Sequence, residues 1–216
     1  MKILIPARKG SVGYPNKNRH LFRQTAASIP KDRHQDVWVT SDDPEILKMA
    51  AEYEFNIIER PDHLALDTTS IREVVAHALP LMDAEPDTLV LMLYLTYPER
   101  TWSDIESAVE YFISFYQLGL TESLLCKKPV KVHPYLHMYE YGLDGIFGRQ
   151  LVQHDLCRRQ DYPPCFEISH FISIFKASQL ATLNRNMYCP STVFYPICSN
   201  IVDVDLESDL KNVKEV

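Results

Sequence analysis

The sequence lacks the features that are typical of membrane proteins, secreted proteins, disulfide-rich proteins and zinc-thiolate proteins. No apolar run in its 216 residues reaches the roughly 18 residues of a membrane-spanning helix. The opening MKILIPARKG has too short an apolar stretch for a signal peptide. The five cysteines form no CxxC pair, which argues against a disulfide framework or a thiolate zinc site. We therefore expect a cytoplasmic protein that does not enter membranes and whose cysteines are packed as free thiols.

Positive charge is in deficit, with 22 basic against 29 acidic residues and a net charge of −7. We therefore expect the protein as a whole to repel nucleic acid and anionic membranes. The basic residues are nevertheless concentrated at one end, since seven of them precede the first acid, Asp32. This concentration indicates a local site for a small anion, although a chance cluster on a solvated face would give the same composition.

Strand-like and helix-like segments alternate over the first 127 residues. The predicted strands cover residues 1–6, 36–40, 56–59 and 88–95, and another begins at 124. The predicted helices, with capping signals at Asp43, Ser70 and Thr101, cover residues 44–53, 71–82 and 101–117. Such alternation predicts a doubly wound α/β fold with a mainly parallel sheet. Ligands bind beyond the carboxyl ends of such strands, where the loops 7–18 and 96–101 fall.

The second half of the chain is less regular. Residues 128–170 contain several prolines, many aromatic residues and few helical periods. We interpret them as an insertion of extended segments within a single domain spanning 1–216, used for dimerisation or on the substrate side. A strand is predicted at 171–175, a final short strand at 201–205 and a terminal helix at 207–216.

The loop after the first strand has the features of a phosphate-binding turn. In the segment Pro6–Asn18, glycines allow backbone N–H groups to face a phosphate, while Arg8 and Lys17 supply positive charge. The spacing is neither that of a Walker loop nor that of a dinucleotide fingerprint. A flexible surface loop with ordinary basic residues would look similar.

The segment IPARKGSVGYPNKN resembles the N-terminal signature of the CMP-sialic acid and CMP-Kdo synthetase type of cytidylyltransferase. Four further segments resemble that family in the same order: VTSDDPEIL, RPDHLALDTTS, RRQDYP and IVDVDLESDL. The resemblance spans nearly the whole chain and implies the nucleotide-diphospho-sugar transferase fold with a small dimerisation element. It also implies a homodimeric, Mg²⁺-dependent enzyme that transfers CMP from CTP to an acidic sugar and releases pyrophosphate.

The resemblance assigns roles to individual residues. It implies that Arg8 and Lys17 are catalytic cations that bind phosphate, and that Asp203 and Asp205 bind the metal. The implied nucleotide-binding set is Pro6, Ala7, Arg8, Gly10, Ser11, Lys17, Asn18, Arg60, Thr69 and Ser70. The implied sugar-side set is Tyr94, Arg159, Glu167, Ser169 and His170.

The spacing of the two aspartates also suits a metal. On a strand at 201–205, the carboxylates of Asp203 and Asp205 would share one face. Two carboxylates, together with waters and phosphate oxygens, suit Mg²⁺. A solvated strand end before an acid-rich helix start would contain the same residues. No residue is identified as the general base; Asp205, or a water on the metal it holds, is the candidate.

Several positions depart from the family pattern. Val12 stands where many relatives have lysine, Tyr94 replaces a sugar-contacting glutamine, and Glu167–His170 stands where Arg-Pro-Asn-Gly is frequent. We therefore expect a nonulosonic or related acidic sugar other than sialic acid, with its carboxylate bound by Arg159. Two alternatives stay open: a catalytically weak protein that binds a nucleotide or nucleotide-sugar, and a nucleotidyltransferase of the same fold that uses another nucleoside triphosphate.

Overall fold

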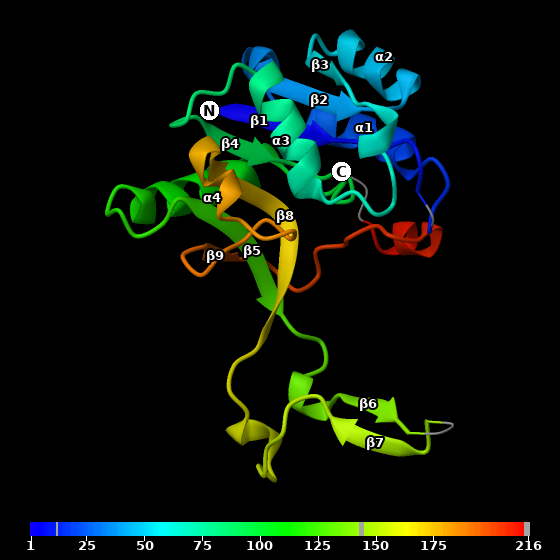
Figure 1. The fold of residues 1–216 in the computed structure, drawn as a ribbon, viewed down its shortest axis with the longest axis vertical. Coiled ribbons are helices and arrows are strands. Elements are labelled where there is room, and N and C mark those ends of the chain that lie inside the picture. Colours follow the sequence, from blue (N-terminus) through cyan, green and yellow to red (C-terminus); the bar gives the residue numbers. More distant parts are fainter. Residues whose placement is uncertain (12, 143–144, 214–216) are drawn as a thin grey trace.

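The computed structural model describes residues 1–11, 13–142 and 145–213, and within these ranges a seven-stranded sheet forms the centre of the molecule (Figure 1). Its strands are β1 Lys2–Pro6, β2 Val37–Ser41, β3 Asn56–Glu59, β4 Leu89–Met92, β5 Ser123–Pro129, β8 Phe166–Lys176 and β9 Val193–Pro196. The order is β3-β2-β1-β4-β8-β5-β9, in which β8 is antiparallel to β4 and β5 and the other neighbours are parallel. The predicted mainly parallel sheet is therefore confirmed.

Helices cover both faces of this sheet. The α-helices are α1 Lys17–Ala27, α2 Pro44–Glu52, α3 Ile71–Leu81 and α4 Trp102–Tyr116. Ile3 of β1 belongs to one core cluster with Phe22 of α1 and Phe112 of α4, whereas Leu4 belongs to a second cluster with Val75 of α3. Because successive side chains of a strand point to opposite faces, the apolar run of β1 is buried on both sides.

The residues predicted to cap the helices do so. Ser70 and Glu73 form a capping box at the start of α3, and Asp43 accepts a hydrogen bond from the Glu45 amide at the start of α2. Thr101 caps α4 in the same way as Ser70 caps α3. None of the described helices is both long and apolar enough to cross a lipid bilayer.

Two elements, α1 and β9, are not predicted by the sequence patterns. Helix α1 begins with three polar residues, and Asn16 before it adopts a φ of 55° without a side-chain capping bond in the described chain. Strand β9 is an edge strand of four residues that pairs only with β5 in the described sheet. Short elements with weak local signals are stabilised mainly by tertiary packing, which the local sequence does not reveal.

The C-terminal segment differs from its prediction. Residues 201–205 are all described and form no strand, and the helix that follows is a short 3₁₀ helix, η7 Glu207–Asn212, with residues 214–216 outside the described part. The Val204 amide donates to the carbonyl of Thr96 at 2.8 Å, and the Val204 side chain is fully buried. The tail therefore crosses the loop after β4 instead of extending the sheet.

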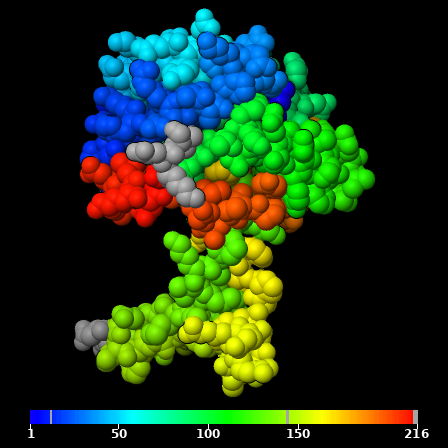
Figure 2. Space-filling model, turned by 180° about the vertical axis from the view of Figure 1, so that it is seen from behind, coloured from blue at the N-terminus to red at the C-terminus, as the bar shows by residue number. Residues whose placement is uncertain are grey.

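Residues 130–142 and 145–165 form an arm that projects away from the sheet between β5 and β8 (Figures 1 and 2). The arm carries a hairpin of β6 Met138–Tyr141 and β7 Phe147–Gln150, whose residues are all exposed. The insertion is shorter than the predicted 128–170, because residues at both of its ends belong to β5 and β8. Its role in dimerisation stays a prediction.

We expect Phe112→Ala to lower the free energy of unfolding by about 3–5 kcal/mol, because its ring is fully buried between α4 and the sheet. Leu118→Ala is the matched control, since that side chain is 71% exposed and its loss should change stability by less than about 0.5 kcal/mol. Urea denaturation at fixed protein concentration measures both. Equal losses in the two variants would contradict the assigned core.

Candidate functional site

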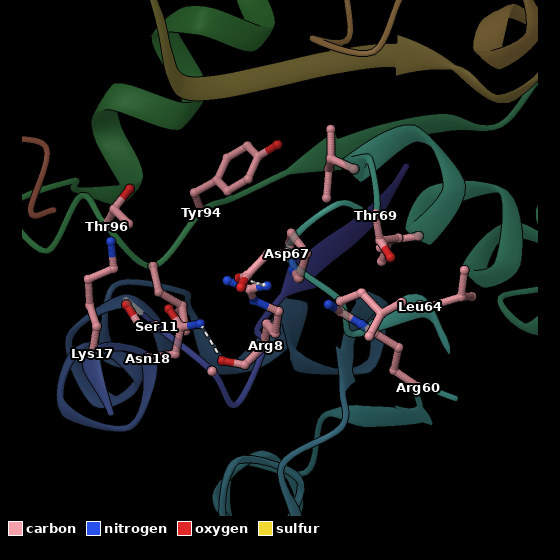
Figure 3. A pocket seen from close by; sticks show the side chains of 16 residues that line it. Arg8, Ser11, Lys17, Asn18, Arg60, Leu64, Asp67, Thr69, Tyr94 and Thr96 are labelled. Carbon is pink, nitrogen blue, oxygen red and sulfur yellow. Dashed lines mark hydrogen bonds and ion pairs between the residues drawn. The ribbon is translucent and has the colours of Figure 1, made fainter. Parts of the chain in front are cut away.

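A cavity of about 310 Å³ lies at the carboxyl ends of β1 and β4, the edge at which such sheets bind ligands (Figure 3). Its walls come from the loop after β1, the first turn of α1, the segment 60–74 and the loop after β4. The sequence-predicted site residues that line it are Pro6, Arg8, Gly10, Ser11, Lys17, Asn18, Arg60, Thr69 and Tyr94. Segments separated by up to 90 positions in the sequence thus enclose one cavity.

One wall of the cavity is basic. The Asn18 side-chain amide donates to the carbonyl of Arg8 at 2.8 Å, which ties the loop to the first turn of α1 (Figure 3). The Arg8 guanidinium forms an ion pair with the carboxylate of Asp67, whose side chain is 71% exposed. Lys17 lies at the start of α1, where the helix dipole also favours an anion. Val12, which stands where many relatives have lysine, lies outside the described residues.

The basic turn meets the C-terminal tail. Lys17 Nζ lies 2.9 Å from Asp205 Oδ1, although the two residues are 188 positions apart. A Cβ atom added at Gly13 would lie 2.7 Å from the Asp205 carbonyl oxygen, so the backbones approach closely. The Asp209 carboxylate accepts hydrogen bonds from the amides of Asp205 and Leu206 and fixes the turn of the tail. Figure 2 shows the C-terminal segment (red) packed against the N-terminal part of the chain (blue).

The second aspartate of the tail has different neighbours. The Tyr97 hydroxyl donates to Asp203 Oδ2 at 2.8 Å and lies 3.2 Å from the Ser169 hydroxyl. The His170 ring packs edge-on against Tyr94, with the ring centroids 5.4 Å apart. The structure therefore brings three of the predicted sugar-side residues, Tyr94, Ser169 and His170, close to Asp203.

Burial sets the protonation of the rings near Asp203. Burial raises the pKa of the Tyr94 and Tyr97 phenols, and the Asp203 carboxylate raises both further, so both keep their protons at neutral pH. Burial lowers the pKa of the His170 imidazole more than the Asp203 charge raises it, so this ring is neutral. These three side chains offer uncharged donors and acceptors beside a carboxylate.

Arg60 provides a positive charge at the cavity wall. Its side chain is only 5% exposed, and one guanidinium nitrogen donates to the Thr40 carbonyl at 2.9 Å. Burial lowers the pKa of Arg60 to about 10, so the group remains a cation at neutral pH. Its Nε atom is buried without a hydrogen-bond partner in the described part of the chain. A buried cation with an unsatisfied donor gains free energy from an anionic ligand.

Besides Ser169, His170, Asp203 and Asp205, four further predicted site residues do not line the cavity. Ala7 is buried, and its amide donates to the Thr40 carbonyl. The Ser70 hydroxyl caps α3 through Glu73. Glu167 pairs with Lys128 at the base of the arm, and Arg159 lies on the arm, in the wall of a separate cavity. Arg159 and Glu167 are therefore not brought to Asp203 within one chain.

Other residues of the site are missing from the predicted set. Leu64, Leu66, Asp67 and Thr96 line the cavity, and Tyr97 bonds to Asp203. Thr96 and Tyr97 fall in the loop 96–101, which the strand order places at the ligand-binding edge. The sequence therefore indicated that they lie near the site. Leu64 to Asp67 lie within the segment RPDHLALDTTS that resembles the family, although the sequence analysis did not single them out as site residues.

The tail aspartates have the donor set for Mg²⁺. Their carboxylates flank the buried Val204 and lie beside a basic cavity, but the described residues contain no group of three or more potential metal ligands. Mg²⁺ is usually bound by one or two carboxylates and completed by substrate phosphates and waters. Asp203 and Asp205 fit this pattern, and metal binding stays a prediction.

No protein-family model matches the chain. The chain is 28% identical to "Post-translational flagellin modification protein B" of Campylobacter coli, over 97% of this chain and 92% of that protein. It is 24% identical to an N-acylneuraminate cytidylyltransferase of Streptococcus agalactiae, over 97% of this chain and about half, 51%, of that protein. Its fold is similar to that of CMP:2-keto-3-deoxy-manno-octonic acid synthetase complexed with CTP, with a TM-score of 0.62, 13% identity and coverage of 97% and 95% of the two chains.

The predicted resemblance to the cytidylyltransferases is confirmed. The structural likeness establishes the fold, and the sequence likeness extends over 97% of the chain. A cytidylyltransferase fold accounts for a basic cavity at the carboxyl edge of the sheet, since nucleotides bind there in doubly wound proteins.

We expect Gly13→Ala to loosen the tail, because its Cβ would overlap the Asp205 carbonyl oxygen and overpacking costs about 1–3 kcal/mol. Amide hydrogen exchange at Val204, whose N–H bonds to Thr96, should quicken by about tenfold. Gly10→Ala is the control, because a Cβ there meets no atom within 4 Å. An unchanged exchange rate in Gly13→Ala would contradict the close approach of turn and tail.

Proposed function

We propose that this protein transfers CMP from CTP to an acidic sugar and releases pyrophosphate. The observation that carries the proposal is the contact between Lys17 and Asp205, which joins the basic turn to the acidic tail at one cavity. The similarity to cytidylyltransferases over 97% of the chain supports it independently. CTP is an intracellular nucleotide, which favours a cytoplasmic location.

The basic wall would bind the triphosphate. Arg8 would exchange its contact with the exposed Asp67 for phosphate oxygens, and Arg60 would supply a buried charge from the cavity wall. Lys17 would steady the pyrophosphate that leaves. Since Asn18 holds the Arg8 backbone, the loop is oriented before the nucleotide arrives, which lowers the entropic cost of binding.

Asp203 and Asp205 would hold Mg²⁺. Bound there, the metal would neutralise the triphosphate and stabilise the charge that develops in the transition state. The Lys17 ammonium that now pairs with Asp205 would then turn to phosphate oxygens.

The reaction is an in-line displacement at the α-phosphorus. A sugar hydroxyl oxygen forms a bond to the α-phosphorus, the bond from phosphorus to the bridging oxygen breaks, and the pyrophosphate carries away the electron pair. The hydroxyl proton passes to a base, for which Asp205 or a neighbouring water is the candidate. Positioning of the two substrates supplies most of the rate in such transfers.

The sugar would lie beside Asp203, against Tyr94, Ser169 and His170. Because Arg159 lies on the arm, it can reach a sugar carboxylate only if the arm of a second copy extends to this cavity. A homodimer formed through the arms would meet this requirement. It would also cover exposed apolar side chains of the arm, namely Leu136, Met138, Tyr139, Ile146 and Phe147.

We expect pyrophosphate release from CTP to depend on an acidic nonulosonic or related sugar. Because Tyr94 replaces the glutamine of relatives and His170 is neutral, the best substrate of a panel should differ from plain sialic acid. Coupled detection of pyrophosphate measures turnover across the panel. Highest activity with sialic acid would overturn the proposed sugar preference, and activity with no acidic sugar would favour a binding protein without turnover.

We expect Asp203→Asn and Asp205→Asn to lose Mg²⁺-dependent turnover while the fold persists, since Asp205 is exposed, Asp203 is half-buried and asparagine keeps the shape of each side chain. A protein that only binds nucleotide would bind it equally well in both variants.

Thermal unfolding with CTP, UTP, GTP or ATP identifies the nucleotide, because a ligand that prefers the folded state raises the Tm. A larger Tm increase with another nucleotide than with CTP would replace CTP as the donor.

A further inference from the structure

The Asp203 carboxylate ends a chain of hydrogen bonds that starts in the sheet. The Phe171 amide of β8 donates to the Ser169 hydroxyl oxygen at 3.3 Å. The Ser169 and Tyr97 hydroxyl oxygens lie 3.2 Å apart, and the Tyr97 hydroxyl lies 2.8 Å from Asp203 Oδ2. Because the carboxylate accepts, Tyr97 donates to Asp203 and Ser169 donates to Tyr97. Each hydroxyl therefore donates once and accepts once.

The two hydroxyls of this chain are held rigidly. Tyr97 and Ser169 are each 3% exposed, so water does not compete for their hydrogen bonds. The Tyr97 ring packs edge-on against Phe171, with the ring centroids 5.5 Å apart and the planes at 86°. Packing fixes the ring, and the Ser169 hydroxyl fixes the direction in which the Tyr97 proton points. Such a chain holds its last acceptor in one orientation.

The two tail aspartates are therefore held in different ways. Asp205 forms an ion pair with the Lys17 ammonium, whereas Asp203 accepts a hydrogen bond from the uncharged Tyr97 hydroxyl. Among the described residues, no hydrogen bond is formed by the other Asp203 oxygen, Oδ1. An oriented carboxylate with one oxygen held and the other available is suited to bind a divalent cation.

We propose that Tyr97 is a positioning residue that orients Asp203 as a ligand for the divalent cation that accompanies the triphosphate. This role rests on the proposed function and goes further, since it assigns the orientation of Asp203 to a tyrosine that does not line the cavity. Ser169 acts one step further back, by orienting the Tyr97 hydroxyl.

The test compares CTP affinity in Mg²⁺ with CTP affinity in EDTA, measured by calorimetry without sugar so that no turnover occurs. Tyr97→Phe keeps the ring and its packing on Phe171 but removes the donor. Loss of such a supporting hydrogen bond costs about 10–100-fold in metal affinity. We expect Tyr97→Phe to lower CTP affinity about tenfold in Mg²⁺ and to leave it unchanged in EDTA. Ser169→Ala should give a smaller loss in Mg²⁺ alone.

Two controls separate positioning from a general structural effect. Tyr111→Phe removes a hydroxyl on α4 that forms no hydrogen bond with the described residues, and it should change neither affinity. In an Asp203→Asn background, Tyr97→Phe should have no further effect, because its partner carboxylate is already gone. A loss of the same size in both backgrounds, or a loss that also occurs in EDTA, would show a structural role and overturn the inference.

The outcomes also distinguish this inference from the proposed function. If Asp203→Asn loses the Mg²⁺-dependent gain in affinity while Tyr97→Phe keeps it, the positioning role is wrong and the metal site stands. If the unmodified protein binds CTP equally in Mg²⁺ and EDTA, the metal-dependent function fails and the positioning role fails with it.

Discussion

The ion pair between Lys17 and Asp205 is the contact on which the candidate site depends, because it joins residues 188 positions apart. An ion pair with one exposed partner contributes little stability by itself. The tail is held by other contacts, namely the buried Val204 side chain, its amide bond to Thr96 and the close approach at Gly13. Packing therefore brings the charges together, and the charges determine what the cavity can bind.

The site has two chemically different sides. The cavity on the side of β1 and α1 presents cations that are paired with exposed acidic groups, so an incoming anion can replace those partners. Beside the cavity, β8 and the loop after β4 place neutral hydroxyl and imidazole groups around Asp203. This division suits a reaction in which a triphosphate and a sugar meet at a shared carboxylate pair.

Elements with strong local signals agree closely with prediction. The strand β3 matches its predicted bounds, and α3 begins at the capping box expected from Ser70 and Glu73. Helix α1 and strand β9 are not predicted because their first residues carry no capping or alternation signal. The aspartate pair is predicted on a strand, but the described tail has no strand there, since Val204 bonds to a loop instead of a sheet edge. The spacing of the two aspartates indicated a shared site on the basis of a strand, and that strand does not form.

The sequence alone determined most of the strands and helices of the first 127 residues, the basic loop after the first strand and the aspartates of the tail. Those features are local, because periodicity, caps and charge act over a few residues. Only the tertiary structure decided that Tyr97 and Ser169 reach Asp203, that Asp67 pairs with Arg8 and that Arg159 lies on a distant arm. These contacts join segments far apart in the chain, and their geometry follows from how the sheet and helices pack, which no short stretch of sequence encodes.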